Sequence, residues 1–218
     1  MKRTLLWVTA LWVSAASASV TEVHQWQATP GKTEAMLASA VEARTIHEKL
    51  GATVFIGVDQ NGIMHYAATF PDWAAWGVWT DKIGASKEWA DFNKKYDTDP
   101  PAATHLTSFL LDTPIEAKTQ PVLVVASWKV APGKLESVLA AFREFVAVDT
   151  KLGGSVGFDT DEFGNAHYEL TFPSYAAYGK WIVAADKSPE RAALIKKWDA
   201  DPKAELTKFY VITQYAAK

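Results

Sequence analysis

The sequence contains an internal repeat, and this repeat limits the possible folds more than any other feature. The segment His65–Pro71 (HYAATFP) returns 102 positions later as His167–Pro173 (HYELTFP). Aligned at this offset without a gap, residues 23–112 and 125–214 are identical at 33 of 90 positions. Because the identities extend along the whole length, we expect the two copies to share one fold.

Residues 1–18 are typical of a secretory signal peptide. Lys2 and Arg3 precede an apolar run, Leu5–Val13, and the small residues Ala16-Ser17-Ala18 follow it as a cleavage site. A membrane anchor is the alternative, but the run is shorter than the roughly 20 residues that a spanning helix needs. We expect cleavage near Ala18 and a periplasmic or secreted protein that no membrane holds.

Composition and charge narrow the classes of function. The chain is 49% hydrophobic and 12% aromatic, which is enough for a packed core. Its formal net charge is −3 and its Lys and Arg residues form no cluster, so nucleic acid is not an expected partner. The absence of Cys excludes disulfides, thiol nucleophiles and thiolate metal ligands. A monomer and a homodimer are both compatible with these features.

Each copy has the same predicted order of elements. Strands are expected at 23–28, 53–58, 63–70 and 104–111, and again at 122–130, 155–160, 165–172 and 206–213. Helices are expected at 33–49 and 135–151, then after the N-caps Asp72 and Ser174, and then from Ser86 and Ser188. This βαββαβ order is typical of a ferredoxin-like unit, whose antiparallel sheet has helices on one face.

The other face of each sheet has to be covered, and the second copy is the nearest cover. We therefore predict an α+β protein in which two ferredoxin-like repeats, residues 19–112 and 122–218, pack sheet to sheet. The result is a single-chain pseudo-dimeric α+β barrel with its helices outside. Residues 113–121 form a linker that is too short to let the repeats separate.

Two segments of the second copy resemble a known family. Val122–Lys134 (VLVVASWKVAPGK) and Tyr168–Tyr178 (YELTFPSYAAY), followed by Ser188-Pro189, resemble antibiotic-biosynthesis-monooxygenase-like domains of the dimeric α+β barrel superfamily. The resemblance implies a barrel, which such families build from two subunits, and a cofactor-independent monooxygenase activity. Haem-degrading relatives tend to carry a His on the helix after the third strand. This chain has Trp79 and Trp181 there, so no cofactor is expected.

The third strand of each copy carries the strongest candidates for a ligand pocket. Alternation places its apolar residues against the helices, and His65, Thr69, His167, Glu169 and Thr171 on the other face, toward the space between the sheets. Neutral imidazole accepts or donates a proton near physiological pH, and a carboxylate beside it could orient it or act as a base. The alternative role is structural, with two hydrogen-bonded His residues closing the interface between the sheets.

Trp79 and Trp181 are further candidates for the pocket, because both copies keep them on the second helix. Aromatic residues in such a stripe more often belong to the core between helix and sheet. Trp79 and Trp181 are therefore pocket candidates, with a place in the core between helix and sheet as the alternative.

A metal site is not expected. His24, His65 and His105 lie on neighbouring strands, but His24 faces the helices whereas His65 faces the other sheet. At the positions that match His24 and His105, the second copy has Ala126 and Thr207. Three converging imidazoles are therefore not predicted in either copy.

Three functions remain open. The first is an exported protein that binds a small apolar or aromatic molecule in the cavity between the sheets, and this is our leading hypothesis. The second is a cofactor-independent monooxygenase-like enzyme that uses His or Glu as a base. The third is a non-catalytic interaction module whose barrel is filled by side chains.

Overall fold

The computed structural model describes residues 18–216, so residues 1–17 of the predicted signal peptide lie outside the described part. The first half comprises β1 (Ser19–Ala28), α1 (Thr33–Lys49), β2 (Thr53–Asp59), β3 (Ile63–Phe70), α2 (Trp73–Ala85), α3 (Lys87–Tyr96) and β4 (Ala103–Ile115). The second half has the same order: β5 (Val122–Val130), α4 (Leu135–Lys151), β6 (Ser155–Asp161), β7 (Asn165–Phe172), α5 (Tyr175–Asp186), α6 (Pro189–Ala200) and β8 (Ala204–Gln214). No helix in this part of the chain combines the length and apolar character needed to cross a membrane.

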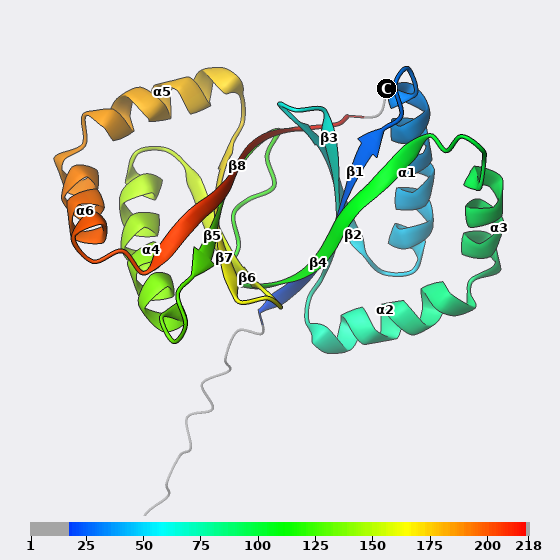
Figure 1. Ribbon diagram of the computed structural model, residues 1–218, viewed down its shortest axis with the longest axis horizontal. Coiled ribbons are helices and arrows are strands. Elements are labelled where there is room, and N and C mark those ends of the chain that lie inside the picture. The colour runs from blue at the N-terminus through cyan, green and yellow to red at the C-terminus, as the bar shows by residue number, and fades with distance from the viewer. Residues whose placement is uncertain (1–17, 217–218) are drawn as a thin grey trace, which may run out of the picture.

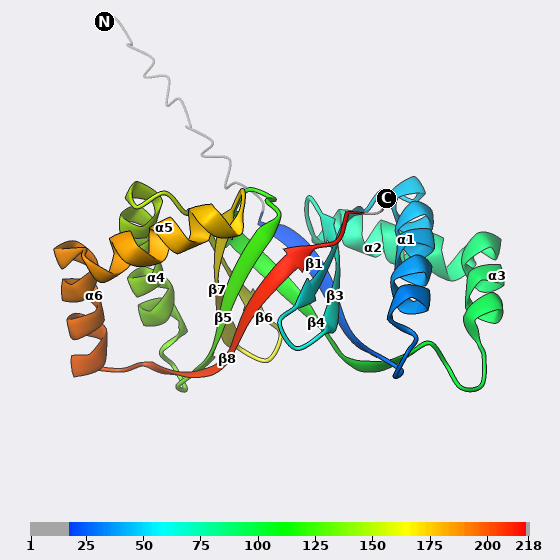
Figure 2. The same cartoon turned by 90° about the horizontal axis from the view of Figure 1, so that it is seen from above.

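The strands form one closed barrel in the order β1-β3-β2-β8-β5-β7-β6-β4. Each half contributes an antiparallel sheet of four strands, and the two sheets join where β2 pairs with β8 and where β4 pairs with β6. The helices α1–α3 cover one flank of the barrel and α4–α6 the opposite flank (Figures 1 and 2). The predicted pseudo-dimeric α+β barrel is therefore confirmed, with hydrogen-bonded sheet edges as an added feature.

Side-chain caps begin the helices that follow each hairpin. Asp72 Oδ1 accepts a hydrogen bond from the Ala75 amide at 2.7 Å, and Ser174 Oγ accepts one from the Ala177 amide at 3.2 Å. Ser86 and Ser188 cap α3 and α6 in the same way. Each such cap is worth about 1 kcal/mol and fixes where the chain turns back along the sheet.

Each half has its own hydrophobic core, between its helices and the outer face of its sheet. The core of the first half includes Met36, Ile56, Tyr66 and Phe70, and that of the second includes Val138, Phe142, Phe158 and Phe172. Because successive residues of a strand face opposite sides, the alternate residues of the same strands face the barrel interior. The outer faces thus supply the two cores, and the inner faces remain for a site.

The gap-free alignment of the two copies fails at the last strand. Val23 lies opposite Phe109, whereas its counterpart Val125 lies opposite Tyr210, so β4 and β8 match at an offset of 101 rather than 102. The second half has one residue fewer before this strand. The structural counterpart of His105 is consequently Leu206, which lies opposite Trp128, and not Thr207.

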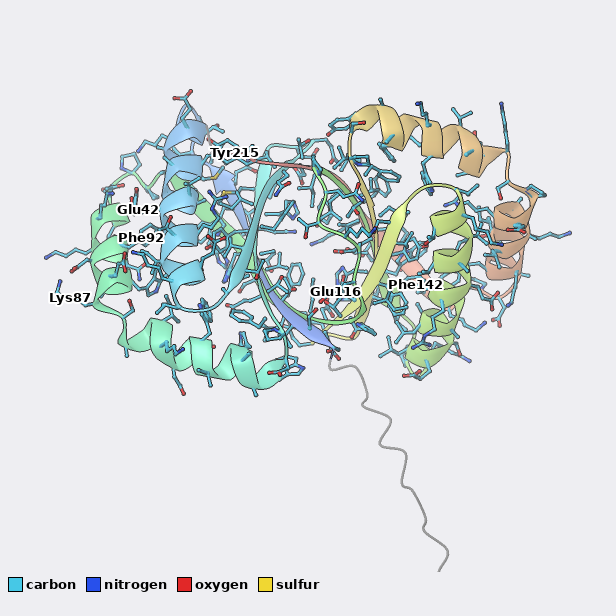
Figure 3. The ribbon with its side chains drawn as sticks, turned by 180° about the vertical axis from the view of Figure 1, so that it is seen from behind. Glu42, Lys87, Phe92, Glu116, Phe142 and Tyr215 are labelled. Carbon is cyan, nitrogen blue, oxygen red and sulfur yellow. The ribbon has the colours of Figure 1, made fainter. Side chains whose placement is uncertain are left out.

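The segment between the halves is part of the barrel end. β4 continues to Ile115, into the predicted linker. The Lys118 amide donates to Ser155 Oγ at 2.9 Å, and Thr171 Oγ1 donates to the Lys118 carbonyl at 2.7 Å. A Cβ at Gly157 would lie 2.5 Å from the Ala117 nitrogen, so the backbone passes directly over β6. Figure 3 labels Glu116 on this segment, between the two halves.

Candidate functional site

A cavity of about 620 Å³ occupies the interior of the barrel. Its wall comes from the inner faces of both sheets and includes Thr21, Val23, Gln25, Phe55, His65, Ala67, Thr69 and Phe109 of the first half. The second half contributes Leu123, Val125, Ser127, Asp159, His167, Glu169, Thr171 and Tyr210. This volume is typical of small-molecule sites. The expectation of a barrel filled by side chains is therefore wrong.

In the first half, His65 forms a buried dyad with Asp59, the last residue of β2. His65 Nε2 lies 3.3 Å from Asp59 Oδ2, and His65 Nδ1 lies 3.4 Å from the Gln25 amide nitrogen. Asp59 Oδ1 accepts hydrogen bonds from the Asn61 and Ile63 amides in the hairpin turn. One carboxylate therefore fixes both the turn and the imidazole.

The second half repeats this dyad. His167 Nε2 lies 3.2 Å from Asp161 Oδ2, and His167 Nδ1 lies 2.8 Å from Ser127 Oγ. Asp161 Oδ1 accepts hydrogen bonds from the Phe163 and Asn165 amides. Both Asp residues lie just beyond the strands predicted at 53–58 and 155–160, and their contact with His was not predicted. The signal was present, because each copy has Asp followed by His six positions later.

In the second half the dyad places a negative charge beside the imidazole. Burial by itself raises the pKa of Asp161, but hydrogen bonds from His167 and Asn165 outweigh this effect and lower the pKa to about 2. In the first half, burial lowers the pKa of His65, and the hydrogen bond to Asp59 opposes that shift. His65 is therefore neutral at pH 7 and is able to accept a proton.

Each imidazole also packs against an aromatic ring from the other half. Phe109 of β4 stacks on His167, with ring centroids 5.7 Å apart and an interplanar angle of 6°. Tyr210, its counterpart on β8, meets His65 edge to face at 5.0 Å. Since each ring bridges the halves, the two dyads contribute to holding the barrel together as well as lining its cavity.

A pair of carboxyl groups, Asp159 of β6 and Glu169 of β7, lies in the wall of the second half. Gly157, two residues before Asp159, pairs with Glu169, so the two side chains are diagonal neighbours on the inner face, and Thr113 Oγ1 donates to Asp159 Oδ1. Burial, followed by the neighbouring Glu169 carboxylate, raises the pKa of Asp159 well above its usual range. Burial also raises the pKa of Glu169. Two ionised carboxylates offer no donor to each other, so the pair retains a proton more readily than either group alone.

The predicted Thr residues both face the cavity, but each has a partner. Thr69 Oγ1 lies 2.9 Å from Thr21 Oγ1 on the neighbouring strand. Thr171 is buried and donates to the linker carbonyl of Lys118. These hydroxyl groups are therefore hydrogen-bonded within the wall of the cavity.

The prediction that Trp79 and Trp181 belong to the pocket is wrong. Trp79 packs on Phe70 at 5.0 Å and on His47 at 5.1 Å, in the core between α2 and the sheet. Trp181 packs on Phe172 at 5.7 Å in the second core. Both rings lie behind the outer face of the sheet, so the β-strands separate them from the cavity.

His24, His65 and His105, the three His residues considered for a metal site, do not converge. His24 Nε2 contacts Glu22 Oε1 at 3.1 Å on the helix side of β1, and His105 packs beside Trp26. His65 lies on the opposite side of the sheet, inside the barrel. Within residues 18–216 no three His, Asp or Glu side chains are arranged to hold a metal ion.

The sequence matches no protein-family model and no curated protein. Solved structures do resemble the fold. A protein of Fusobacterium nucleatum described as a "putative monooxygenase" matches with a TM-score of 0.69 and 12% identity, over 92% of this chain and 94% of that one. One of Lactobacillus acidophilus with the same description gives 0.65 and 13%, over 91% and 94%. An anthrone oxidase-like protein gives 0.60 and 12%, over 94% of each chain. At these identities the likeness is one of fold.

Proposed function

We propose that this protein binds a small apolar or aromatic molecule inside the barrel. The observation that carries the proposal is the 620 Å³ cavity, whose wall combines apolar and aromatic side chains with hydroxyl, imidazole and carboxyl groups. In binding sites for small molecules apolar area supplies affinity and polar atoms fix orientation. The His65 and His167 dyads and Glu169 are the polar groups that would meet the ligand.

The binding proposal is tested with an uncharged aromatic probe such as N-phenylnaphthylamine, whose fluorescence rises in apolar surroundings. We expect saturable binding that an Ala67→Trp substitution abolishes, because Ala67 lines the cavity and an indole there would occupy it. The matched control is Ala74→Trp, at an exposed position on α2. Equal probe binding by the two variants would refute a ligand site inside the barrel.

A second candidate is a cofactor-independent monooxygenase-like enzyme with Glu169 as the base. The Asp159–Glu169 pair favours it, because burial raises the pKa of Glu169 and a carboxylate with a raised pKa is a better proton acceptor from a weakly acidic substrate. The likeness to an anthrone oxidase-like protein suggests anthrone as a first substrate. Dioxygen uptake with anthrone should fall roughly 100-fold or more in Glu169→Gln, the usual effect of losing a general base. Absence of uptake by the unmodified protein would leave the binding function alone.

We propose further that the protein is exported and that its two halves arose by tandem duplication. Export is supported by the charged, apolar and small-residue pattern of residues 1–18. Duplication is supported by the 33 identities in 90 aligned positions and by the matching order of elements. The mass of the protein recovered from outside the cytoplasm tests export, because cleavage after Ala18 leaves a chain that begins at Ser19.

A further inference from the structure

The two walls of the cavity differ most at the Asp159–Glu169 pair. The matching positions of the first half are Gly57 and Ala67, so one wall carries two carboxyl groups where the other carries none. Next to Ala67 the first half places the ring of Phe55. The cavity is therefore acidic on the wall of the second half, and the matching place of the first half has a glycine, an alanine and the ring of Phe55.

Two buried polar atoms at or beside the Asp159–Glu169 pair have no hydrogen-bond partner within residues 18–216. They are Asp159 Oδ2 and Ser19 Oγ, on side chains of residues that are 2% and 7% exposed. Ser19 pairs with Thr113 across β1 and β4, and Thr113 in turn binds Asp159 Oδ1. Buried polar atoms are rarely left without a partner, so this cluster is built to receive one from a ligand.

The charges around the pair favour a positive partner. Among the lining residues, four carry carboxyl groups (Glu116, Asp159, Asp161 and Glu169) and two are Lys (Lys118 and Lys208). Within residues 18–216 neither Asp159 nor Glu169 forms an ion pair, and Asp161 is taken by His167. Glu116 adds negative charge near Asp159, and His167 is the nearest group that opposes it at Glu169. An anionic ligand would meet repulsion here.

We propose that Asp159 and Glu169, with Ser19, bind the protonated amine of a small aromatic ligand whose ring lies toward Phe55 and Phe109. This inference rests on the proposed binding function and names its ligand class. An ammonium group has three donors and no acceptor, which matches an open carboxylate oxygen, a second carboxylate and a hydroxyl. The aromatic rings of the wall add an attraction for the cation.

Binding of an amine also moves a proton. A proton held by the carboxyl pair leaves to solvent when the ammonium takes its place, and no other bond changes. Amine affinity should therefore rise with pH over the range in which the carboxyl pair loses this proton, while a neutral ligand should show no such trend. The size of the proton release is measured by calorimetry in two buffers of different ionisation enthalpy.

The test uses the mature chain and three probes with one ring and different head groups: phenethylamine, phenethyl alcohol and phenylacetate. Each is titrated at pH 8 against bound N-phenylnaphthylamine. We expect phenethylamine to bind roughly 10- to 100-fold more tightly than the alcohol, the usual range for a charge-assisted contact, and phenylacetate to bind most weakly. In Asp159→Asn combined with Glu169→Gln, the preference for the amine over the alcohol should disappear.

Equal affinity for the three probes, or tightest binding of phenylacetate, would overturn the inference and leave the proposed binding function intact. If the unmodified protein bound none of the three but still bound the dye, the inference would again fall alone. If N-phenylnaphthylamine did not bind either, both the inference and the proposed binding function would be refuted. Should the double variant not fold, the order of affinity of the three head groups for the unmodified protein decides the matter, since a preference for phenylacetate contradicts the inference.

Discussion

Tyr66 and Tyr168 occupy the same position in the two halves, yet they bind partners of opposite character. The Tyr66 hydroxyl lies 2.9 Å from Nδ1 of buried His47, whose ring packs on Trp89 at 4.7 Å. The Tyr168 hydroxyl donates to buried Asp149 at 2.9 Å. Arg191, which takes the place of Trp89, donates to the other oxygen of Asp149 at 3.0 Å.

We infer that the side chains at positions 47 and 89 depend on each other, as do those at 149 and 191. Each of these pairs is called a matched set below. A neutral imidazole is stable against an aromatic ring, whereas a buried carboxylate needs a cation. The inner dyads Asp59–His65 and Asp161–His167 have not diverged in this way, because each also holds its hairpin turn. Between helices and sheet, the fold thus requires two side chains that complement each other, and their identity can differ between the halves. Inside the barrel it requires an Asp–His pair in both halves.

The largest effect is expected when one member of the first matched set, positions 47 and 89, is changed. His47→Asp buries a carboxylate without a cation, and we expect the free energy of unfolding to fall by about 4 kcal/mol at pH 7. Adding Trp89→Arg should restore roughly half of the loss, because the guanidinium then meets the carboxylate as Arg191 does. Urea denaturation of the two single variants and the double variant measures the coupling.

The two substitutions must be coupled for the comparison to hold. Losses that simply add in the double variant would show that the two positions are independent. The outcome would then assign the His-to-Asp and Trp-to-Arg differences to unrelated drift rather than to a matched set.

Acid should affect the two halves in opposite directions. Burial lowers the pKa of His47 from 6.5 to about 4, so the unfolded chain binds a proton there before the folded one does. This contribution to stability is complete above about pH 6.5 and is lost as the pH falls toward 4, at a cost of about 2 to 3 kcal/mol. Burial raises the pKa of Asp149, so the second half gains stability over the acidic range.

Denaturation at pH 7 and at pH 4.5 measures this effect. The His47→Gln variant keeps an acceptor for Tyr66 but has no titrating group, so it should lose less stability on acidification than the unmodified protein. Equal losses would mean that His47 already titrates normally in the folded state.

A third contrast concerns Gly157 and its counterpart Phe55. The first half has a large ring at this position, whereas a Cβ at Gly157 would lie 2.6 Å from the Ile115 carbonyl oxygen. Gly157→Ala should therefore displace the linker and cost about 2 kcal/mol of stability. Gly179→Ala on α5, where a Cβ has open space, should instead stabilise by up to about 1 kcal/mol. Thermal denaturation distinguishes the two, and a neutral Gly157→Ala would mean that the linker is not held against β6.

The sequence predicted the barrel and the cavity-facing side of the third strands because both depend on local patterns. The strand alternation and the caps at Asp72 and Ser174 each act over a few residues, and the repeat applies them to both copies. The closure of the barrel through β2–β8 and β4–β6 depends on contacts between the copies, which no local pattern encodes. Asp159 was missed for the same reason, since its neighbour Glu169 reaches it only through the register of β6 and β7.

The smallest expected effect tests whether the inner dyads are structural in both halves. His65→Gln and His167→Gln each keep a donor for the adjacent Asp but lose the contact between imidazole and aromatic ring, so each should cost about 1 kcal/mol. If the dyads serve the fold alone, the two losses should be similar and binding of the aromatic probe should not change. If ligand chemistry is confined to the second half, only His167→Gln should alter probe affinity, because His167 adjoins Glu169 whereas His65 faces Ala67. A larger change in probe affinity in His65→Gln than in His167→Gln would instead assign the ligand's polar contacts to the first half.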